Sequence, residues 1–254
     1  MIHLPILRVG QRERFPPVEH ALIEPNGLLA VGGDLSVERL LDAYSLGIFP
    51  WFSPSQPILW WSPDPRIVFD TDRIHVAARF ARWLHKCRWH IRADSAFGDV
   101  MLGCAEHREG QDGTWIGREM RIAYERLHDR GYAHSVEVWD GLSLVGGIYG
   151  VAIGQMFFGE SMFSRTSNAS KVALLALCHV LQALEVPLLD AQVASSHLLS
   201  LGAYEMPRTL FCARVAQLTR LPATPARWSA LTFPDPVDLG QTADRLTSAH
   251  ANPR

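Results

Sequence analysis

The segment from residue 159 to residue 192 constrains the fold of this chain more than any other part. Its pattern predicts a strand, a polar loop, a helix over 168–185 and a second strand over 187–193. Three polar side chains, Glu160, Asp190 and Gln192, interrupt these otherwise apolar strands. A buried carboxylate or amide lowers stability unless a partner binds it, so these residues on neighbouring strands predict a functional site.

The flanking residues predict the rest of a mixed sheet. Alternation at period two, followed by the hairpin signal Asp140-Gly141, predicts strands at 133–139 and 142–152, with a third strand at 156–162. A meander followed by a helix and one more strand in the same sheet indicates a mixed α/β (α+β) fold. The other predicted elements are a strand at 66–69, helices at 74–87, 95–107, 117–130 and 195–201, and a strand at 208–215.

The chain divides by composition into three parts. Residues 1–65 are rich in proline, glycine and aromatic residues, which predicts a small N-terminal domain with little regular structure. One helix is expected there, with Ser36 as its N-cap and Gly47 at its end. Residues 66–221 form the α/β domain, and the proline-rich segment 222–254 predicts loop or disorder.

Composition excludes several classes of protein. The net charge of −2 and a pI near 6.6 exclude a globally basic nucleic-acid binder, although a local basic patch remains compatible. The four cysteines form no CxxC pair and the histidines show no metal-ligand spacing, so no metal is expected. Reduced thiols predict a cytoplasmic protein, and neither a signal peptide nor a membrane span is expected.

A basic cluster lies on the helix expected at 74–87. Arg79, Arg82 and Lys86 share one helix face, Arg88 follows, and no acidic residue occurs between Asp72 and Asp94. Two interpretations stay open, a solvated polar surface and a phosphate-binding surface.

The polar residues of the strands also allow two interpretations each. Glu160 either faces solvent, pairs with Arg165, or is functional, and the apolar residues on both sides of it favour function. Asp190 and Gln192 share one strand face, so Asp190 either orients the side-chain amide of Gln192 for a substrate or caps the helix at 195–201.

Two loop features bear on ligands. The loop 164–171 opens a helix, which favours an anion, but it lacks the glycines typical of a coenzyme A site. This argues against acetyl-coenzyme A as a substrate. The loop aromatics are either the core of a small domain or a platform for stacking a nucleobase, and they include Trp51, Phe52, Trp60, Trp61 and Trp115.

Several blocks of the chain resemble one known family, the bacterial leucyl/phenylalanyl-tRNA–protein transferases. The resemblance is collinear from about residue 15 to about residue 214. It rests on Phe49-Pro-Trp-Phe-Ser-Pro, Ile58-Leu-Trp-Trp-Ser-Pro-Asp-Pro-Arg, Gly113-Thr-Trp-Ile, Tyr132-Ala-His-Ser-Val-Glu-Val-Trp, Leu144-Val-Gly-Gly-Ile-Tyr-Gly-Val, Gly159-Glu-Ser-Met-Phe-Ser-Arg, Asn168-Ala-Ser-Lys and Leu201-Gly-Ala.

The resemblance implies a GNAT-like acyltransferase domain preceded by a small N-terminal domain. It implies a cytoplasmic, monomeric enzyme that needs no coenzyme A or other cofactor. Such an enzyme moves Leu or Phe, and less well Met, from aminoacyl-tRNA to an acceptor protein whose N-terminal residue is Arg or Lys. The product carries an N-terminal degradation signal.

The resemblance also implies roles for individual residues. Glu160, Asp190 and Gln192 would be the catalytic residues. The family often has Phe at position 177, where this chain has Leu, and can have Met at position 148, where this chain has Ile. The preference between Leu and Phe as the transferred amino acid therefore stays open. The 3′ end of aminoacyl-tRNA and its amino acid would contact Tyr44, Trp51, Trp115, Tyr124, Ile148, Met162 and Leu177. The tRNA phosphates would contact Arg79, Arg82, Lys86 and Arg88.

Two rival functions remain at this point. One is a coenzyme A-dependent N-acetyltransferase, and the other is a non-catalytic RNA-binding module. In the transferase hypothesis Gln192 accepts a hydrogen bond from the attacking α-amine. Glu160 then either pairs with the cationic acceptor side chain or orients the acceptor N-terminus, and which carboxylate takes part in proton transfer stays open.

Overall fold

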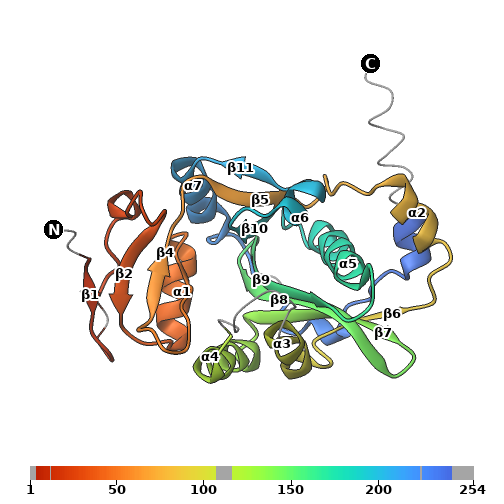
Figure 1. The fold of residues 1–254 in the computed structure, drawn as a ribbon, viewed down its shortest axis with the longest axis horizontal. Helices are drawn as coiled ribbons and strands as arrows, with labels where there is room; N and C mark the ends of the chain where they lie inside the picture. The colour runs from red at the N-terminus through yellow and green to blue at the C-terminus, as the bar shows by residue number, and fades with distance from the viewer. Residues whose placement is uncertain (1–3, 12, 107–115, 224, 242–254) are drawn as a thin grey trace, which may run out of the picture.

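The computed structural model describes residues 4–11, 13–106, 116–223 and 225–241, which form two sheets and the helices around them (Figure 1). The smaller sheet has the strand order β1-β2-β4-β3 and belongs to the N-terminal part of the chain. The larger sheet has the order β11-β5-β10-β9-β8-β7-β6. The strands of the smaller sheet are β1 (Ile6–Leu7), β2 (Leu28–Gly32), β3 (Phe49–Pro50) and β4 (Leu59–Trp61).

The N-terminal part is more regular than its composition predicts. It contains a four-stranded sheet that the sequence does not predict, because the strands are two to five residues long, too short to show an alternating pattern. The expected helix is confirmed as α1 (Val37–Ser45), where the Ser36 side chain accepts a hydrogen bond from the Arg39 backbone N–H. A 3-10 turn, η1 (Val18–His20), precedes the sheet.

The larger sheet confirms the predicted mixed α/β fold. Its strands β7, β8 and β9 form the antiparallel meander, and β10 lies parallel to β9 and antiparallel to β5. The likeness to GNAT acyltransferases and the domain boundaries stay predictions. The strands are β5 (Arg66–Asp70), β6 (His90–Ala93), β7 (Ala133–Asp140), β8 (Ser143–Ile153), β9 (Met156–Ser164), β10 (Leu188–Gln192) and β11 (Tyr204–Met206).

Helices cover both faces of the larger sheet (Figure 1). One face packs against α3 (Phe97–Ala105) and α4 (Arg118–Asp129), and the opposite face packs against α5 (Ala169–Ala183). Each face has its own apolar cluster; the cluster on the α3 and α4 side continues into the N-terminal part. The remaining helices are α2 (Ala78–Leu84), α6 (Ser196–Ser200) and α7 (Arg208–Leu218). Within the described residues every helix is too short or insufficiently apolar to cross a membrane.

The predicted strand at 208–215 is wrong, because these residues begin helix α7. Its buried residues Phe211, Val215 and Leu218 follow the helical spacing, and they pack into the cluster that contains the N-terminal part. The strand of this region is the three-residue β11, which precedes the helix.

The segment after Leu221 packs against the α/β domain. Its described part contains the 3-10 turn η2 (Trp228–Ala230) and helical residues at 236–241, so the prediction of loop or disorder is wrong for these residues, and Trp228 is fully buried. The Trp228 ring stacks on the imidazole of His134 at 4.3 Å between centroids, and its backbone N–H donates to Asp94 Oδ2 over 3.0 Å. Residues 225–241 therefore contribute to the core.

Replacing Trp228 by Leu should lower the free energy of unfolding by about 2 kcal/mol, roughly half the cost of truncating a buried aromatic residue to alanine. Urea unfolding followed by circular dichroism measures this. Trp51→Leu is the matched control, since Trp51 is 43% exposed, and its effect should stay below about 0.5 kcal/mol. Equal effects of the two replacements would show that the segment adds little to stability.

Candidate active site

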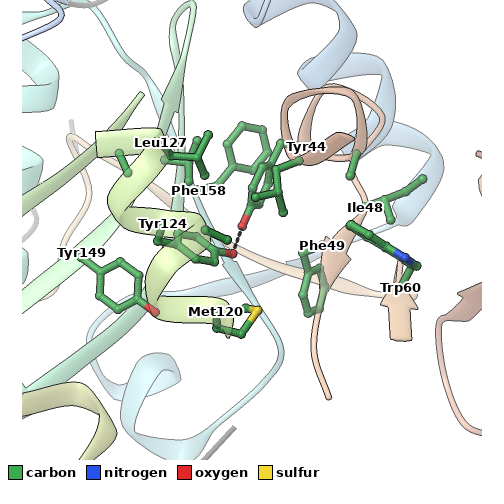
Figure 2. Close-up of a cluster of buried hydrophobic side chains, with 14 of the residues drawn as sticks. Tyr44, Ile48, Phe49, Trp60, Met120, Tyr124, Leu127, Tyr149 and Phe158 are labelled. Atoms are coloured by element: carbon green, nitrogen blue, oxygen red, sulfur yellow. Dashed lines mark hydrogen bonds between the residues drawn. The ribbon is translucent and has the colours of Figure 1, made fainter. Parts of the chain in front are cut away.

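The carboxylate of Glu160 lies at the centre of a hydrogen-bonded group. Oε1 accepts from the Tyr44 hydroxyl over 2.7 Å and from Gln192 Nε2 over 2.8 Å, and Oε2 accepts from the Tyr124 hydroxyl over 2.8 Å. The two tyrosine hydroxyls are also within hydrogen-bonding distance of each other, so two protons are shared among three contacts, and Figure 2 shows the hydroxyls meeting between α1 and α4. The structure thus brings together four of the predicted site residues.

A β-bulge accounts for the direction of the Glu160 side chain. Gly159 pairs with Gly150 and Ser161 pairs with Tyr149, so Glu160 is an extra residue without a partner on β8. The bulge also changes which face the following residues occupy. Phe158 lies in the cluster on the α3 and α4 side, whereas Met162 lies against the cluster under α5.

Gln192 lies at a second irregularity, at the end of β10. The parallel pairing of β9 with β10 ends at Phe158 and Asp190, and the register with β5 shifts between Asp190 and Gln192. Gln192 has a φ of +64°, a conformation that L-residues rarely adopt, and its backbone N–H donates to Asp190 Oδ1 over 2.9 Å. The two bulged strands therefore aim the Gln192 amide at the Glu160 carboxylate.

Asp190 does not act as the sequence suggested. It accepts from the backbone N–H of Gln192, and the side-chain amide of Gln192 donates to Glu160 instead. The alternative role as a helix cap is wrong, because Ser195 caps α6. The second partner of Asp190 is Arg66, in an ion pair that is almost completely buried.

Burial raises the pKa of Glu160 to about 7, and the nearby charge of Asp190 adds to this effect, while the hydrogen bonds from Tyr44, Tyr124 and Gln192 oppose it. The pKa values of both tyrosines are raised well above their ordinary value by burial and by the charge of Glu160. Near neutral pH the group therefore holds one carboxylate that changes protonation and two hydroxyls that keep their protons.

An apolar group lies on the opposite face of the sheet. Ile148 of β8 pairs directly with Met162 of β9, and Leu177 of α5 belongs to the same cluster. Leu177 is fully buried and Ile148 nearly so, while Met162 is partly exposed. The structure brings these three together, but on the other face of β9 from the tyrosines.

Comparison with known proteins identifies the family. Residues 68–216 match the family model described as leucyl/phenylalanyl-tRNA protein transferase, and residues 33–64 match the model of the N-terminal domain of this family. The chain belongs to the leucyl/phenylalanyl-tRNA protein transferase family. It is therefore an aminoacyltransferase, and the resemblance seen in its motifs is confirmed.

Curated relatives with this name align over most of their length. The transferase of Xanthomonas campestris pv. campestris (strain B100) is 61% identical over 216 residues, which is 85% of this chain and 87% of the relative. That of Xylella fastidiosa (strain M23) is 60% identical over 218 residues, covering 85% of this chain and 90% of the relative. A solved structure, L-PGS from Bacillus licheniformis, matches with 8% identity and a TM-score of 0.37, covering 66% of this chain and 53% of that chain.

The loop aromatics of this transferase divide between core and surface. Trp60 is fully buried and Phe52 nearly so, whereas Trp51 is exposed and lies 5.8 Å from the ring of Trp61. The Trp61 indole N–H donates to the Trp51 carbonyl oxygen over 2.6 Å, which fixes the backbone there. Trp115, the remaining aromatic candidate, lies outside the described residues.

The basic residues of the transferase lie far from this group. Helix α2 is at the opposite end of the molecule from α1 (Figure 1). Arg79 and Arg82 are exposed on α2, but the helix ends at Leu84. Lys86 and Arg88 are also exposed, but they lie beyond the helix and do not continue its basic face. The predicted helix over 74–87 is therefore too long.

The loop before α5 makes the contacts of an ordinary helix start. Ser164 Oγ accepts from the Ser170 backbone N–H over 2.8 Å, and Arg165 pairs with Glu106 rather than with Glu160. The alternative in which Arg165 neutralises Glu160 is thus wrong. Among the described residues no three His, Cys, Asp or Glu side chains are grouped as metal ligands.

Arg66 is a residue of this group that the sequence patterns do not predict. This arginine stands at the start of the apolar strand β5 and contacts Asp190, which lies 124 positions later in the chain. The only local signal is a charged residue that directly precedes three apolar ones, and the same argument that singled out Glu160 applies to it.

Proposed function

We propose that this chain transfers Leu or Phe, and less well Met, from aminoacyl-tRNA to the N-terminal Arg or Lys of acceptor proteins, which gives them a degradation signal. The observation that supports this best is the ionisable Glu160, bonded to Gln192 and two tyrosines, in a member of this family. We further propose that the enzyme acts as a monomer in the cytoplasm and uses no cofactor.

The proposed reaction is the aminolysis of an ester. The α-amine of the acceptor attacks the ester carbonyl carbon, the bond from that carbon to the ribose oxygen breaks, and a proton moves from the amine to the ribose oxygen. An α-amino group has a pKa of about 8, so part of it is neutral at physiological pH and positioning supplies much of the rate.

Gln192 orients the amine in this proposal. Its Nε2 group is held by Glu160, and no donor among the described residues bonds to its side-chain oxygen. That oxygen is placed to accept a hydrogen bond from the α-amine. The apolar group of Ile148, Met162 and Leu177 would hold the Leu or Phe side chain.

Glu160 is the carboxylate that takes part in proton transfer. Its pKa of about 7 suits a group that accepts a proton from the acceptor ammonium near neutral pH. Asp190 is unsuited to this role, because it is fully buried in an ion pair with Arg66, whereas Glu160 has no cationic partner among the described residues and is partly exposed. Asp190 is therefore a positioning residue.

Transfer of radiolabelled Leu from Leu-tRNA to two peptides that differ only in an N-terminal Arg or Ala tests this function. Label on the Arg peptide alone is the expected result. Label on neither peptide, with tRNA still bound, would favour the non-catalytic RNA-binding module. Acetylation of the peptide by acetyl-coenzyme A without tRNA would favour the N-acetyltransferase.

The apolar group gives a prediction on specificity. Met162→Ala should lower kcat/KM for Leu-tRNA by about tenfold, since removing a few methylene-sized groups from a pocket changes binding by about 1–3 kcal/mol. Phe-tRNA should lose less, because the larger ring fills part of the added space. A competition assay with both charged tRNAs measures the ratio, and an unchanged ratio would place the pocket elsewhere.

The basic residues give a prediction on tRNA binding. They are exposed on and after α2, and we propose that they contact tRNA phosphates distant from the aminoacyl end. Arg79→Ala combined with Arg82→Ala should raise the KM for Leu-tRNA and leave kcat unchanged. KM should also depend less on salt concentration, because about two fewer counterions are released on tRNA binding. The same KM and salt dependence as wild type would assign these residues to a solvated surface.

A further inference from the structure

The guanidinium group of Arg66 is enclosed by five contacts. Its Nε donates to Asp190 Oδ1 over 2.8 Å, its Nη2 to Asp190 Oδ2 over 2.7 Å, and its Nη1 to the carbonyl oxygen of Gly47 over 3.0 Å. The rings of Phe49 and Phe211 lie 4.6 Å and 4.5 Å from the guanidinium carbon. Arg66 is fully buried, so none of these contacts competes with solvent.

One of these contacts reaches the helix that carries Tyr44. Gly47 follows the end of α1, and its backbone N–H donates to the Tyr44 carbonyl oxygen over 2.9 Å. Its φ of +77° and the 2.9 Å that a Cβ atom would leave to Cys212 Sγ require glycine at this position. By binding the Gly47 carbonyl, Arg66 fixes the end of α1 three residues after Tyr44.

The other contacts reach Gln192. Asp190 Oδ1, which Arg66 binds, also accepts from the Gln192 backbone N–H. This bond stabilises the left-handed conformation of Gln192, which is unfavourable for a residue with a side chain. Arg66 therefore acts on both groups that donate to Glu160 Oε1, Tyr44 through α1 and Gln192 through Asp190.

We propose that Arg66 is a positioning residue for the transfer reaction. It holds Tyr44 of the N-terminal part and Gln192 of the larger sheet in their hydrogen bonds to Glu160. Arg66 does not touch the substrate. This inference rests on the proposed function, because the reaction that it serves is the one proposed above.

Arg66→Lys tests the proposal, since Lys keeps the charge but cannot bind Asp190 with two parallel hydrogen bonds. The matched control is Arg39→Lys, a buried arginine of the N-terminal part that lies beside Asp34 and bonds the carbonyl oxygens of Arg8 and Gln11. Two quantities are measured in each protein. They are kcat and KM for Leu-tRNA, and the midpoint of the Glu160 titration by NMR of 13C-labelled glutamate carboxyl groups, assigned with Glu160→Gln.

Arg66→Lys should lower kcat by about 30-fold to 100-fold with KM within about twofold, the size expected of a misplaced reacting group. The Glu160 midpoint should move above its wild-type value, because the hydrogen bonds from Tyr44 and Gln192 that lower this pKa weaken. Arg39→Lys should change neither quantity. A folded Arg66→Lys protein with an unmoved midpoint would overturn the proposal, even if kcat falls, since lost stability alone leaves the titration of the folded molecules unchanged.

If Arg66→Lys does not fold, Phe211→Leu tests whether Arg66 positions Tyr44 and Gln192. It keeps every hydrogen bond of Arg66 and removes one of the two rings, so kcat should fall by about threefold to tenfold with a smaller upward midpoint shift. An unchanged kcat and midpoint would overturn the proposal. Failure of wild type to transfer Leu would instead overturn the proposed function, because the Glu160 midpoint can be compared between variants without any substrate.

Discussion

Glu160→Gln should lower kcat for Leu transfer by about 10²-fold to 10³-fold, in the range of a lost proton acceptor. Gln has the shape of Glu and can still bond Tyr44, Tyr124 and Gln192, but it cannot take a proton from the acceptor ammonium. KM for Leu-tRNA should change by less than about threefold. Single-turnover transfer to an Arg peptide measures the chemical step directly and separates it from product release.

The same replacement should change how stability depends on pH. In the folded protein the pKa of Glu160 is raised from 4.5 to about 7, so the native state binds more protons than the unfolded state between these values. Its contribution to stability is fully present below pH 4.5 and is lost as the pH rises through 7. Over this window wild type should lose about 3 kcal/mol of unfolding free energy that Glu160→Gln does not lose.

Glu125→Gln is the matched control for both effects. Glu125 follows Tyr124 on α4 but is exposed, so its replacement should leave kcat and the pH profile of stability as in wild type. Two results would count against the role of Glu160. One is a Glu160→Gln rate within about tenfold of wild type, and the other is a stability profile parallel to that of wild type.

Asp190→Ala should lower the free energy of unfolding by about 3–5 kcal/mol, because it leaves the buried guanidinium of Arg66 without its counter-ion. This is a large share of the roughly 5–15 kcal/mol that stabilises an ordinary domain. Activity should be lost with it, since the Gln192 backbone also loses its acceptor. Urea unfolding at pH 7 measures the stability change.

The double replacement of Arg66 by Met and Asp190 by Leu separates stability from function. With both charges gone no unpaired ion remains, so most of the stability lost in Asp190→Ala should return, while transfer should stay at least about 10²-fold below wild type. A double variant that is stable and active would show that the ion pair matters for neither positioning nor chemistry. A stable single Asp190→Ala protein would show that water reaches Arg66.

Sequence predicted the parts of the fold that have long, regular patterns. The meander β7–β9 and helix α5 follow clear periodicities over eight to fifteen residues. The sequence predicts a strand at 208–215 in place of α7, because β11 has only three residues and the apolar residues of α7 are spaced for a strand as well as for a helix. The short N-terminal strands were missed for the same reason.

The sequence predicts which polar residues belong to the candidate site but not which hydrogen bonds join them. Glu160, Asp190 and Gln192 were conspicuous as polar residues within apolar strands. Their partners depend on two bulges and on contacts across more than 100 positions, such as the one between Tyr44 and Glu160. No local pattern reports a bulge of this kind, so sequence could not show that Asp190 binds the backbone of Gln192 or that Arg66 lies behind it.

The extra residue in β9 limits which insertions and deletions this chain tolerates. Since side chains alternate between the faces of a strand, removing one residue from 159–161 would turn Met162 toward the tyrosines and leave the apolar group under α5 one member short. Relatives of this enzyme should therefore keep the length of this segment unchanged even where they replace its side chains. Changes in length should be concentrated in connections such as the Asp140-Gly141 turn, where an added residue meets only solvent.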